Sequence, residues 1–282
     1  MRVLKFIPFV LIAVVLLGCS FTVNVPSINT SVTQTFAVSQ SKPIDYDHGD
    51  IQLEMGGGRL NITGGSDQWL SGTVKYNVSS WEPTLSLLNN QMILTQEHSQ
   101  NLGIPDGNII NDWTLQMGDT PTSLEISAGA YAGTLDFSGV PLTNLEINDG
   151  ASKATVRFDS LNPAVMQRFV YKTGASSVEL LGLANANTDS LTFSSGAGDY
   201  TLDFSGQLTQ DMNVKVSSGL SQVKIVIPQG TSATINLNGG LSNVETHGTW
   251  TVNGTQYQTS GSGPTLTIDV EMAVGNLVLQ QQ

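Results

Sequence analysis

The chain has 282 residues, of which 39% are hydrophobic, with 29 Gly and a single Cys. This apolar content can form a buried core, so the composition excludes a disordered chain, and one Cys excludes a small fold held by disulfides. Lys and Arg number 11 against 23 Asp and Glu, which gives a net charge of −12. The chain therefore lacks the basic surface that a nucleic-acid partner requires.

The first 18 residues have the layout of an export signal. Arg2 and Lys5 make a short basic start, and an apolar run follows from Phe6 to Leu17. The run is shorter than the roughly 20 residues of a comfortable membrane span, and its length is typical of a signal peptide. An uncleaved N-terminal anchor with an incidental Cys is the alternative.

The sequence Leu16-Leu17-Gly18-Cys19 resembles the bacterial lipobox. The resemblance implies that residues 1–18 are removed and that a lipid is attached to Cys19. A lone Cys forms no disulfide within its own chain, but it can carry acyl chains that anchor a protein to a membrane. We therefore expect an exported, lipid-anchored bacterial protein. Because Ser20 follows Cys19, the resemblance implies the outer membrane in a bacterium that has two membranes.

Residues 19–47 are expected to form a flexible tether. They are rich in Ser, Thr, Val, Asn and Gln, contain almost no charge and show no helical period. The alternative for the end of this segment is that Phe36-Ala37-Val38 begins the first strand.

Residues 119–282 contain a repeat of about 22 residues. Six segments align on a Gly followed by Ala or Leu, namely Gly129-Ala130, Gly150-Ala151, Gly174-Ala175, Gly196-Ala197, Gly219-Leu220 and Gly240-Leu241. Apolar residues stand five and three positions before each Gly, and six positions after it in all but the last copy. Spacing by two residues predicts strands, and Gly is suited to a tight corner with positive φ where a Cβ would clash.

Such a short strand pair cannot bury its apolar face alone, so the copies must stack. We therefore predict an all-β fold, a β-solenoid of stacked, glycine-cornered repeats. A β-sandwich is the alternative, since it also contains short, evenly spaced strands. In the predicted stack, Asp136 pairs with Arg157 and Lys224 pairs with Glu245 on neighbouring rungs.

Residues 48–118 break the repeat and are expected to supply capping strands. Glu54–Ile62 and Glu271–Leu279 share the pattern E-M-x-x-G-x-L-x-[IL]. Because the terminal repeats of a solenoid are usually atypical, these matching segments are expected to cap the two open ends.

Several of these segments resemble a known family. Glu54–Ile62, Leu124–Ala130 and Ile147–Ser152, together with Tyr76-Asn77 and Trp81-Glu82-Pro83, are similar to the bacterial toast-rack N-terminal domain. That domain is similar to the putative-adhesin β-solenoids and to cell-wall-active-antibiotic response proteins. The resemblance covers roughly residues 48–282 and implies a cell-envelope protein whose molecular role is not characterised.

The search for catalytic groups finds few candidates. Glu125 and Glu146 occupy the same repeat position, so stacking should make their carboxylates repel each other and raise the pKa of one of them. The pair is therefore a candidate for catalysis, and the alternative is that both are solvated charges at the edge of the fold. His48, His98 and His247 have no metal-ligand spacing and are interpreted as surface residues, with a pH-sensing role left open for His247. Trp69, Trp81 and Trp113 could stack on sugars, but core or capping positions are favoured.

The sequence therefore predicts a lipid-anchored envelope protein that binds a cell-wall polymer or an envelope protein, or serves as a structural module. We expect no enzymatic activity, no cofactor, no metal and no nucleic-acid partner. The alternatives are a carbohydrate-active enzyme on a β-helical scaffold and an accessory protein of an envelope-stress response to antibiotics.

Overall fold

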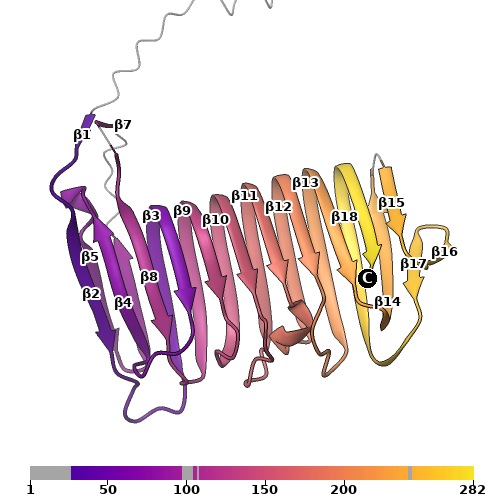
Figure 1. The fold of residues 1–282 in the computed structure, drawn as a ribbon, viewed down its shortest axis with the longest axis horizontal. Helices are drawn as coiled ribbons and strands as arrows, with labels where there is room; N and C mark the ends of the chain where they lie inside the picture. The colour runs from indigo at the N-terminus through magenta and orange to yellow at the C-terminus, as the bar shows by residue number, and fades with distance from the viewer. Residues whose placement is uncertain (1–26, 97–103, 107, 241–242) are drawn as a thin grey trace, which may run out of the picture.

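The computed structural model describes residues 27–96, 104–106, 108–240 and 243–282 (Figure 1). Within these ranges the chain is built from strands and contains no α-helix, only the short 3-10 turns η1 (Ser79–Trp81) and η2 (Leu183–Ala186). The all-β prediction is confirmed. All the strands except β1 (Ser27–Asn29) and β7 (Ile104–Asp106) belong to one mixed sheet of 16 strands.

The middle of this sheet is a row of long strands that pair in parallel. Their order is β3, β9, β10, β11, β12, β13 and β18. Their bounds are Gly49–Thr63, Thr122–Asp136, Leu142–Arg157, Arg168–Leu181, Ser190–Asp203, Met212–Ile227 and Gly261–Gln281. Figure 1 shows these strands side by side as a row of similar rungs.

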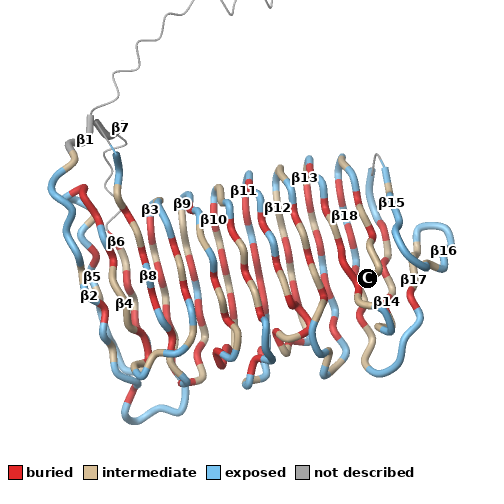
Figure 2. The backbone as a smooth tube through the Cα atoms, viewed as in Figure 1, coloured by how far each residue is buried: buried red, intermediate tan, exposed pale blue. Residues whose placement is uncertain are grey.

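Each long strand bends at its corner residue, which is a glycine in β3 and β9 to β13 and Ala273 in β18, so that the halves before and after the bend run down opposite sides of the rung (Figure 1). Buried residues alternate with more exposed ones along both halves (Figure 2), and the buried side chains of the two halves belong to one hydrophobic core. In β12, for example, the rings of Phe193 and Tyr200 lie on either side of Gly196 with their centroids 5.1 Å apart.

The predicted register of the repeats is confirmed from β9 to β13 and is wrong for the last copy. Leu135 pairs with Val156, Val156 with Leu180, and Leu180 with Leu202, and all four side chains are fully buried. These residues form one row across a continuous sheet, whereas a β-sandwich would divide the strands between two separate sheets.

The C-terminal end differs from the prediction. Strand β18 lies between β13 and the pair β14 (Gly230–Gly239) and β15 (Asn243–His247). The hairpin of β16 (Thr251–Asn253) and β17 (Gln256–Thr259) continues the sheet beyond β14. The chain therefore passes over one position in the stack and fills it with its last strand.

At the N-terminal end, β3 carries different neighbours on its two halves. Its second half pairs with β8 (Asn111–Met117), which is followed by β4 (Leu70–Tyr76) and β2 (Gln34–Gln40). Its first half pairs with β6 (Gln91–Gln96), which is followed by β5 (Pro83–Leu88).

Two expectations about the ends are corrected by this arrangement. The matching segments Glu54–Ile62 and Glu271–Leu279 lie in β3 and β18, which have neighbours on both sides and so do not cap the stack. The predicted tether is also shorter than residues 19–47, because residues 34–40 form strand β2 and pair with β4. The alternative in which Phe36-Ala37-Val38 begins a strand describes this segment correctly.

Candidate functional site

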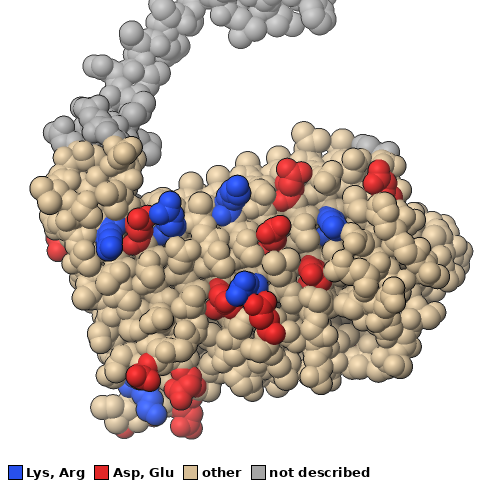
Figure 3. All heavy atoms as spheres, viewed as in Figure 1, with Lys and Arg blue, Asp and Glu red and all other residues tan. Residues whose placement is uncertain are grey.

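The outward side chains form two surfaces, which we name from their place relative to the glycine corner. The first face carries the residues before the corner, such as Glu146 and Asn148 on β10. The second face carries the residues after it, such as Thr155 and Arg157 on the same strand. Figure 3 shows charged groups scattered over a mostly uncharged surface.

The corner glycines are required by a close approach between rungs. A Cβ added at Gly174 would lie 2.4 Å from the carbonyl oxygen of Gly150, and one at Gly150 would lie 2.7 Å from that of Gly129. The corner glycines of β9 to β13 do not have positive φ, so that part of the prediction is wrong. Positive φ occurs instead two residues further on, at Gly58, Gly198 and Gly275, where φ is 146°, 143° and 146°.

A polar row runs along the second face. Its members occupy equivalent positions on seven neighbouring strands and are exposed or half-buried: Thr73, Thr114, Asn61, Thr134, Thr155, Glu179 and Thr201. At a strand spacing of about 4.8 Å the row is about 29 Å long. Thr155 donates a hydrogen bond of 3.3 Å to Glu179. The row presents hydroxyl and amide groups and the carboxylate of Glu179 at the regular spacing of the strands.

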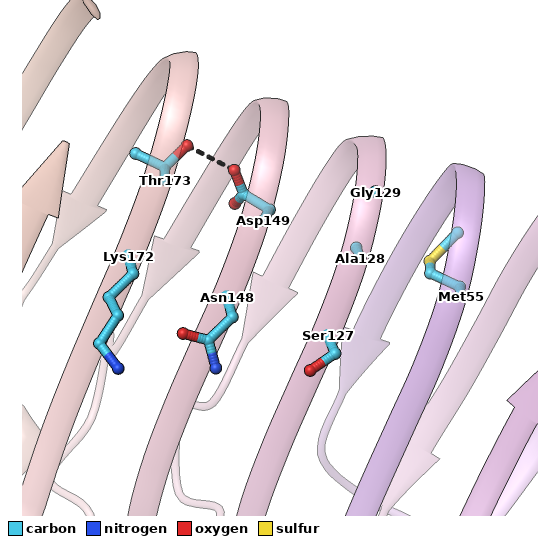
Figure 4. Close-up of a pocket in the computed structure, with 8 residues that line it drawn as sticks. All are labelled: Met55, Ser127, Ala128, Gly129, Asn148, Asp149, Lys172 and Thr173. Atoms are coloured by element: carbon cyan, nitrogen blue, oxygen red, sulfur yellow. Dashed lines mark hydrogen bonds between the residues drawn. The ribbon is translucent and has the colours of Figure 1, made fainter. Parts of the chain in front are cut away.

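Two shallow hollows lie on the first-face side of the glycine corners. One, of about 470 Å³, is lined by side chains of β3, β9, β10 and β11, namely Met55, Ser127, Ala128, Asn148, Asp149, Lys172 and Thr173, with Gly129. In Figure 4, Ser127, Asn148 and Lys172 project from successive strands on the same side of the ribbon. The second, of about 380 Å³, repeats these positions on β12, β13, β18 and β14, with Ser194, Ser217 and Glu271.

A buried carboxylate lies beneath the first hollow. Asp149 is only 9% exposed and accepts hydrogen bonds from the hydroxyls of Tyr171, at 2.9 Å, and of Thr173 (Figure 4). The Tyr171 hydroxyl lies 3.1 Å from that of Tyr131. Burial, more than the nearby Asp149 charge, raises the pKa of both tyrosines. Both phenols therefore stay neutral, and this network ties β9, β10 and β11 together.

The stacked carboxylates Glu125 and Glu146 lie side by side in the sheet as predicted, but the predicted raised pKa is wrong for Glu146. Partial burial raises the pKa of Glu146, but hydrogen bonds from Lys172 (3.0 Å) and Asn148 and the charges of Lys172 and Arg168 outweigh it, so the pKa is lowered. Glu146 is therefore an ionised partner of two cations rather than a proton donor.

The predicted ion pair between Asp136 and Arg157 is confirmed. Arg157 Nη2 lies 2.9 Å from Asp136 and 3.0 Å from Asp159. Partial burial raises the pKa of Asp136, but hydrogen bonds from Ser138 and Arg157 outweigh it and lower the pKa. The pair joins β9 to β10 across the second face.

The predicted pair between Lys224 and Glu245 is wrong. Both residues face Val278 from opposite sides, because β18 lies between their strands. His247, beside Glu245, lies 3.9 Å from that carboxylate and is exposed.

The tryptophans are mainly core residues. Trp69 and Trp113 are 1% and 0% exposed, so they cannot stack on a sugar, whereas Trp81 is half-buried. The indole nitrogen of Trp69 donates to Thr122, and that of Trp113 donates to Asn111. These tryptophans fill the wide N-terminal end of the core.

Several predicted features fall outside the described residues, namely the signal at residues 1–18, the lipid attachment site Cys19 and the candidate His98. No helix in the described ranges has the length and apolarity needed to cross a membrane. Across the same ranges no three His, Cys, Asp or Glu side chains gather into a group suited to a metal ion.

Two features of these surfaces were not predicted from the sequence, namely the Asp149 network and the N-terminal part of the polar row. Asp149 precedes a corner glycine at a position where other copies have Ala128, Thr173, Ser195 and Ser218. A carboxylate among small residues at one repeat position was a detectable signal. Thr73 and Thr114 could not be found this way, since they lie in residues 48–118, where no repeat is visible.

The sequence of this chain matches the model of one known family. The family model described as the N-terminal domain of toast_rack, DUF2154, matches residues 27–164 and 160–226, which together are more than half of the chain. The chain belongs to the toast_rack N-terminal domain family. The resemblance predicted from the glycine corners is thereby confirmed.

Three solved structures align with most of this toast_rack protein. A putative cell adhesion protein from Clostridium sporogenes is 17% identical, with a TM-score of 0.48, over 89% of this chain and 99% of that one. A putative adhesin from Bacteroides fragilis is 12% identical, with a TM-score of 0.41, over 89% and 99%. A putative lipid binding protein from Parabacteroides distasonis is 10% identical, with a TM-score of 0.39, over 91% and 100%. The comparison with curated proteins gives no match.

Proposed function

We propose that this protein is a lipid-anchored β-solenoid of the bacterial cell envelope that binds a cell-wall polymer without catalysing a reaction on it. The anchor in this proposal is Cys19, at the end of the lipobox-like segment Leu16–Cys19. The solenoid is the stack of parallel, glycine-cornered strands around a shared core. The binding surface is the polar row on the second face.

The polar row is the observation that carries the proposal. It presents hydroxyl and amide groups at the strand spacing, is flanked by the ion pairs Arg59–Asp112 and Arg157–Asp136, and has a length of about 29 Å that spans several units of an extended glycan. A flat surface of this kind binds by many weak hydrogen bonds in register rather than by one deep pocket. The shallow hollows on the other side of the stack agree with a protein that does not enclose a small substrate.

The carboxylates support a binding role over hydrolysis. Glycosidases need one carboxyl group with a raised pKa to act as the acid. The candidate Glu146 has a lowered pKa and is paired with Lys172 and Arg168. Asp136 also has a lowered pKa and is paired with Arg157.

The binding test uses the full chain, purified in detergent, and insoluble peptidoglycan as the probe. Replacing Thr134 and Thr155 together by Glu places two negative charges in the middle of the row and should weaken co-sedimentation at least 10-fold. The control replaces Ser123 and Asn144 by Glu, because these residues stand on the same two strands but on the first face. Equal binding by both variants, or no binding by the unsubstituted chain, would contradict the proposal.

Two further measurements complete this test. Release of soluble sugar from the peptidoglycan would show instead that the protein is a carbohydrate-active enzyme. A Cys19→Ser variant should lose fatty-acid labelling and leave the membrane fraction, whereas the unsubstituted chain should keep both properties. A Cys19→Ser variant that stayed membrane-bound would disprove the lipid anchor without affecting the binding surface.

A further inference from the structure

Strand β2 is an open edge of the large sheet. It pairs with β4 on one side, from Gln34 opposite Tyr76 to Gln40 opposite Leu70. On its other side no strand of the described residues pairs with it (Figure 1). The backbone N–H and C=O groups of β2 that point away from β4 therefore have no strand partner among the described residues, and they are a template for another strand.

This edge lacks the features that normally protect a sheet edge. It contains no Lys or other charged residue and no Pro, which are the usual means of preventing edge pairing. The opposite end of the stack is protected, since β16 has only 3 residues and β15 has 5, including Glu245 and His247. The contrast indicates that the β2 edge is kept open for a partner.

The sequence of β2 is a chemical palindrome. Read outward from Ala37 in Gln34–Gln40, the pairs are Phe and Val, then Thr and Ser, then Gln and Gln. Phe36 is half-buried and Val38 is buried, so these two side chains face the core, while Thr35, Ala37 and Ser39 are exposed. If two copies of this strand pair in antiparallel orientation centred on Ala37, each side chain lies opposite one of similar chemistry.

We propose that this protein forms a two-fold symmetric dimer in which the β2 strands of two copies pair in antiparallel register centred on Ala37. Phe36 of each copy then lies opposite Val38 of the other on the core side, and Thr35 lies opposite Ser39 on the outer side. Aromatic with β-branched pairs and Thr with Ser pairs are favourable across strands. A two-fold interface must be self-complementary, which is the property that the palindrome provides.

A second copy fits this edge better than an unrelated peptide. Any extended peptide could satisfy the backbone groups, but only a strand with matched side chains on both faces uses the palindrome. Pairing also covers the exposed part of Phe36, which already packs against the core. The dimer does not depend on the lipid at Cys19 or on the polar row, so it stands apart from the proposed function.

The direct test is a disulfide at the symmetry centre. In the full chain purified in detergent, an Ala37→Cys substitution places two thiols opposite each other, at a Cα separation of about 4.5–5.5 Å that suits a disulfide. The matched control is Thr35→Cys, which is also exposed but stands about 14 Å from its symmetry mate. The native Cys19 is kept in all samples, so the unsubstituted chain gives the background.

Under mild oxidation, the Ala37→Cys chain should form covalent dimers at least 10-fold faster than the Thr35→Cys chain. In sedimentation velocity, the unsubstituted chain should be a dimer, and Ala37→Lys, which brings two positive charges together, should shift it toward the monomer. Equal cross-linking at residues 35 and 37, or a monomeric unsubstituted chain, would overturn the proposal. A monomer would also be the result if the chain's own N-terminal segment covered the edge.

Discussion

At the scale of single residues, the corner glycines are explained by sterics between rungs rather than by backbone conformation. Each one lies beneath a carbonyl oxygen of the neighbouring strand, so a side chain there would push two rungs apart. The repeat of glycine was visible in the sequence, but its reason was not, because the neighbour that excludes the Cβ is distant in sequence, as Gly56 is from Gly129. Gly56 differs, since a Cβ there would meet nothing within 4 Å.

The difference gives a matched pair of substitutions. Gly150→Ala would place its Cβ 2.7 Å from the oxygen of Gly129 and should lower the free energy of unfolding by about 1–3 kcal/mol. Gly56→Ala should change it by less than about 0.5 kcal/mol. Urea unfolding followed by circular dichroism measures both values. Equal effects at the two positions would show that the contact between rungs is not the cause.

The buried Asp149 makes a second prediction at this scale. Asp149→Ala leaves the hydroxyls of Tyr171 and Thr173 buried without their acceptor, which should lower the free energy of unfolding by about 1–3 kcal/mol. The control is Asp199→Ala, an exposed carboxylate on β12 that should cost less than about 0.5 kcal/mol. The same denaturation measurement applies, and a stable Asp149→Ala variant would mean that the hydroxyls find other partners.

At the scale of elements, the strands of the regular repeat were predictable and those outside it were not. The alternation around Leu135, Val156 and Leu202 fixed which side chains face inward, and the glycines fixed the register between β9 and β13. At the C-terminal end, the order of the strands in the sheet does not follow their order in the chain. Lys224 and Glu245 occupy equivalent repeat positions, yet β18 returns from later in the chain to lie between them.

A pair of double-mutant cycles tests this register. Replacing Asp136 and Arg157 by Ala, singly and together, should give a coupling energy of about 0.2–1 kcal/mol at pH 7. The same cycle on Lys224 and Glu245 should give a coupling close to zero, since Val278 separates them. A larger coupling for the second pair than for the first would contradict the strand order.

The first coupling should also depend on pH in one direction. The pKa of Asp136 is lower in the folded protein than its ordinary value, so ionised Asp136 contributes stability above the unfolded value of about 3.9. That contribution should be lost as the pH falls through the folded pKa. A coupling that grew on acidification would show the opposite shift.

At the scale of the whole molecule, the sequence predicted a stack of rungs but not how the stack ends. The central rungs follow from one repeated pattern, whereas the ends depend on contacts between distant segments. Residues 34–40 pair with β4 because a free backbone edge is available there, and hydrophobic pattern alone does not reveal such an edge. The polar row likewise has a part within the regular repeat and a part outside it. The part of the polar row from Thr134 to Thr201 was predictable, and its extension to Thr73 was not.

The parallel strands form one stack in which the C-terminal strand β18 fills the position next to β13. Disulfide formation in two double-cysteine variants measures this strand order most directly, with the unsubstituted chain and its native Cys19 as the background control. Lys224→Cys with Val278→Cys joins neighbouring strands, at about 4.8 Å, whereas Lys224→Cys with Glu245→Cys spans about 9.6 Å. We predict an intramolecular disulfide in the first variant and none in the second. A disulfide between positions 224 and 245, with none between 224 and 278, would contradict this strand order.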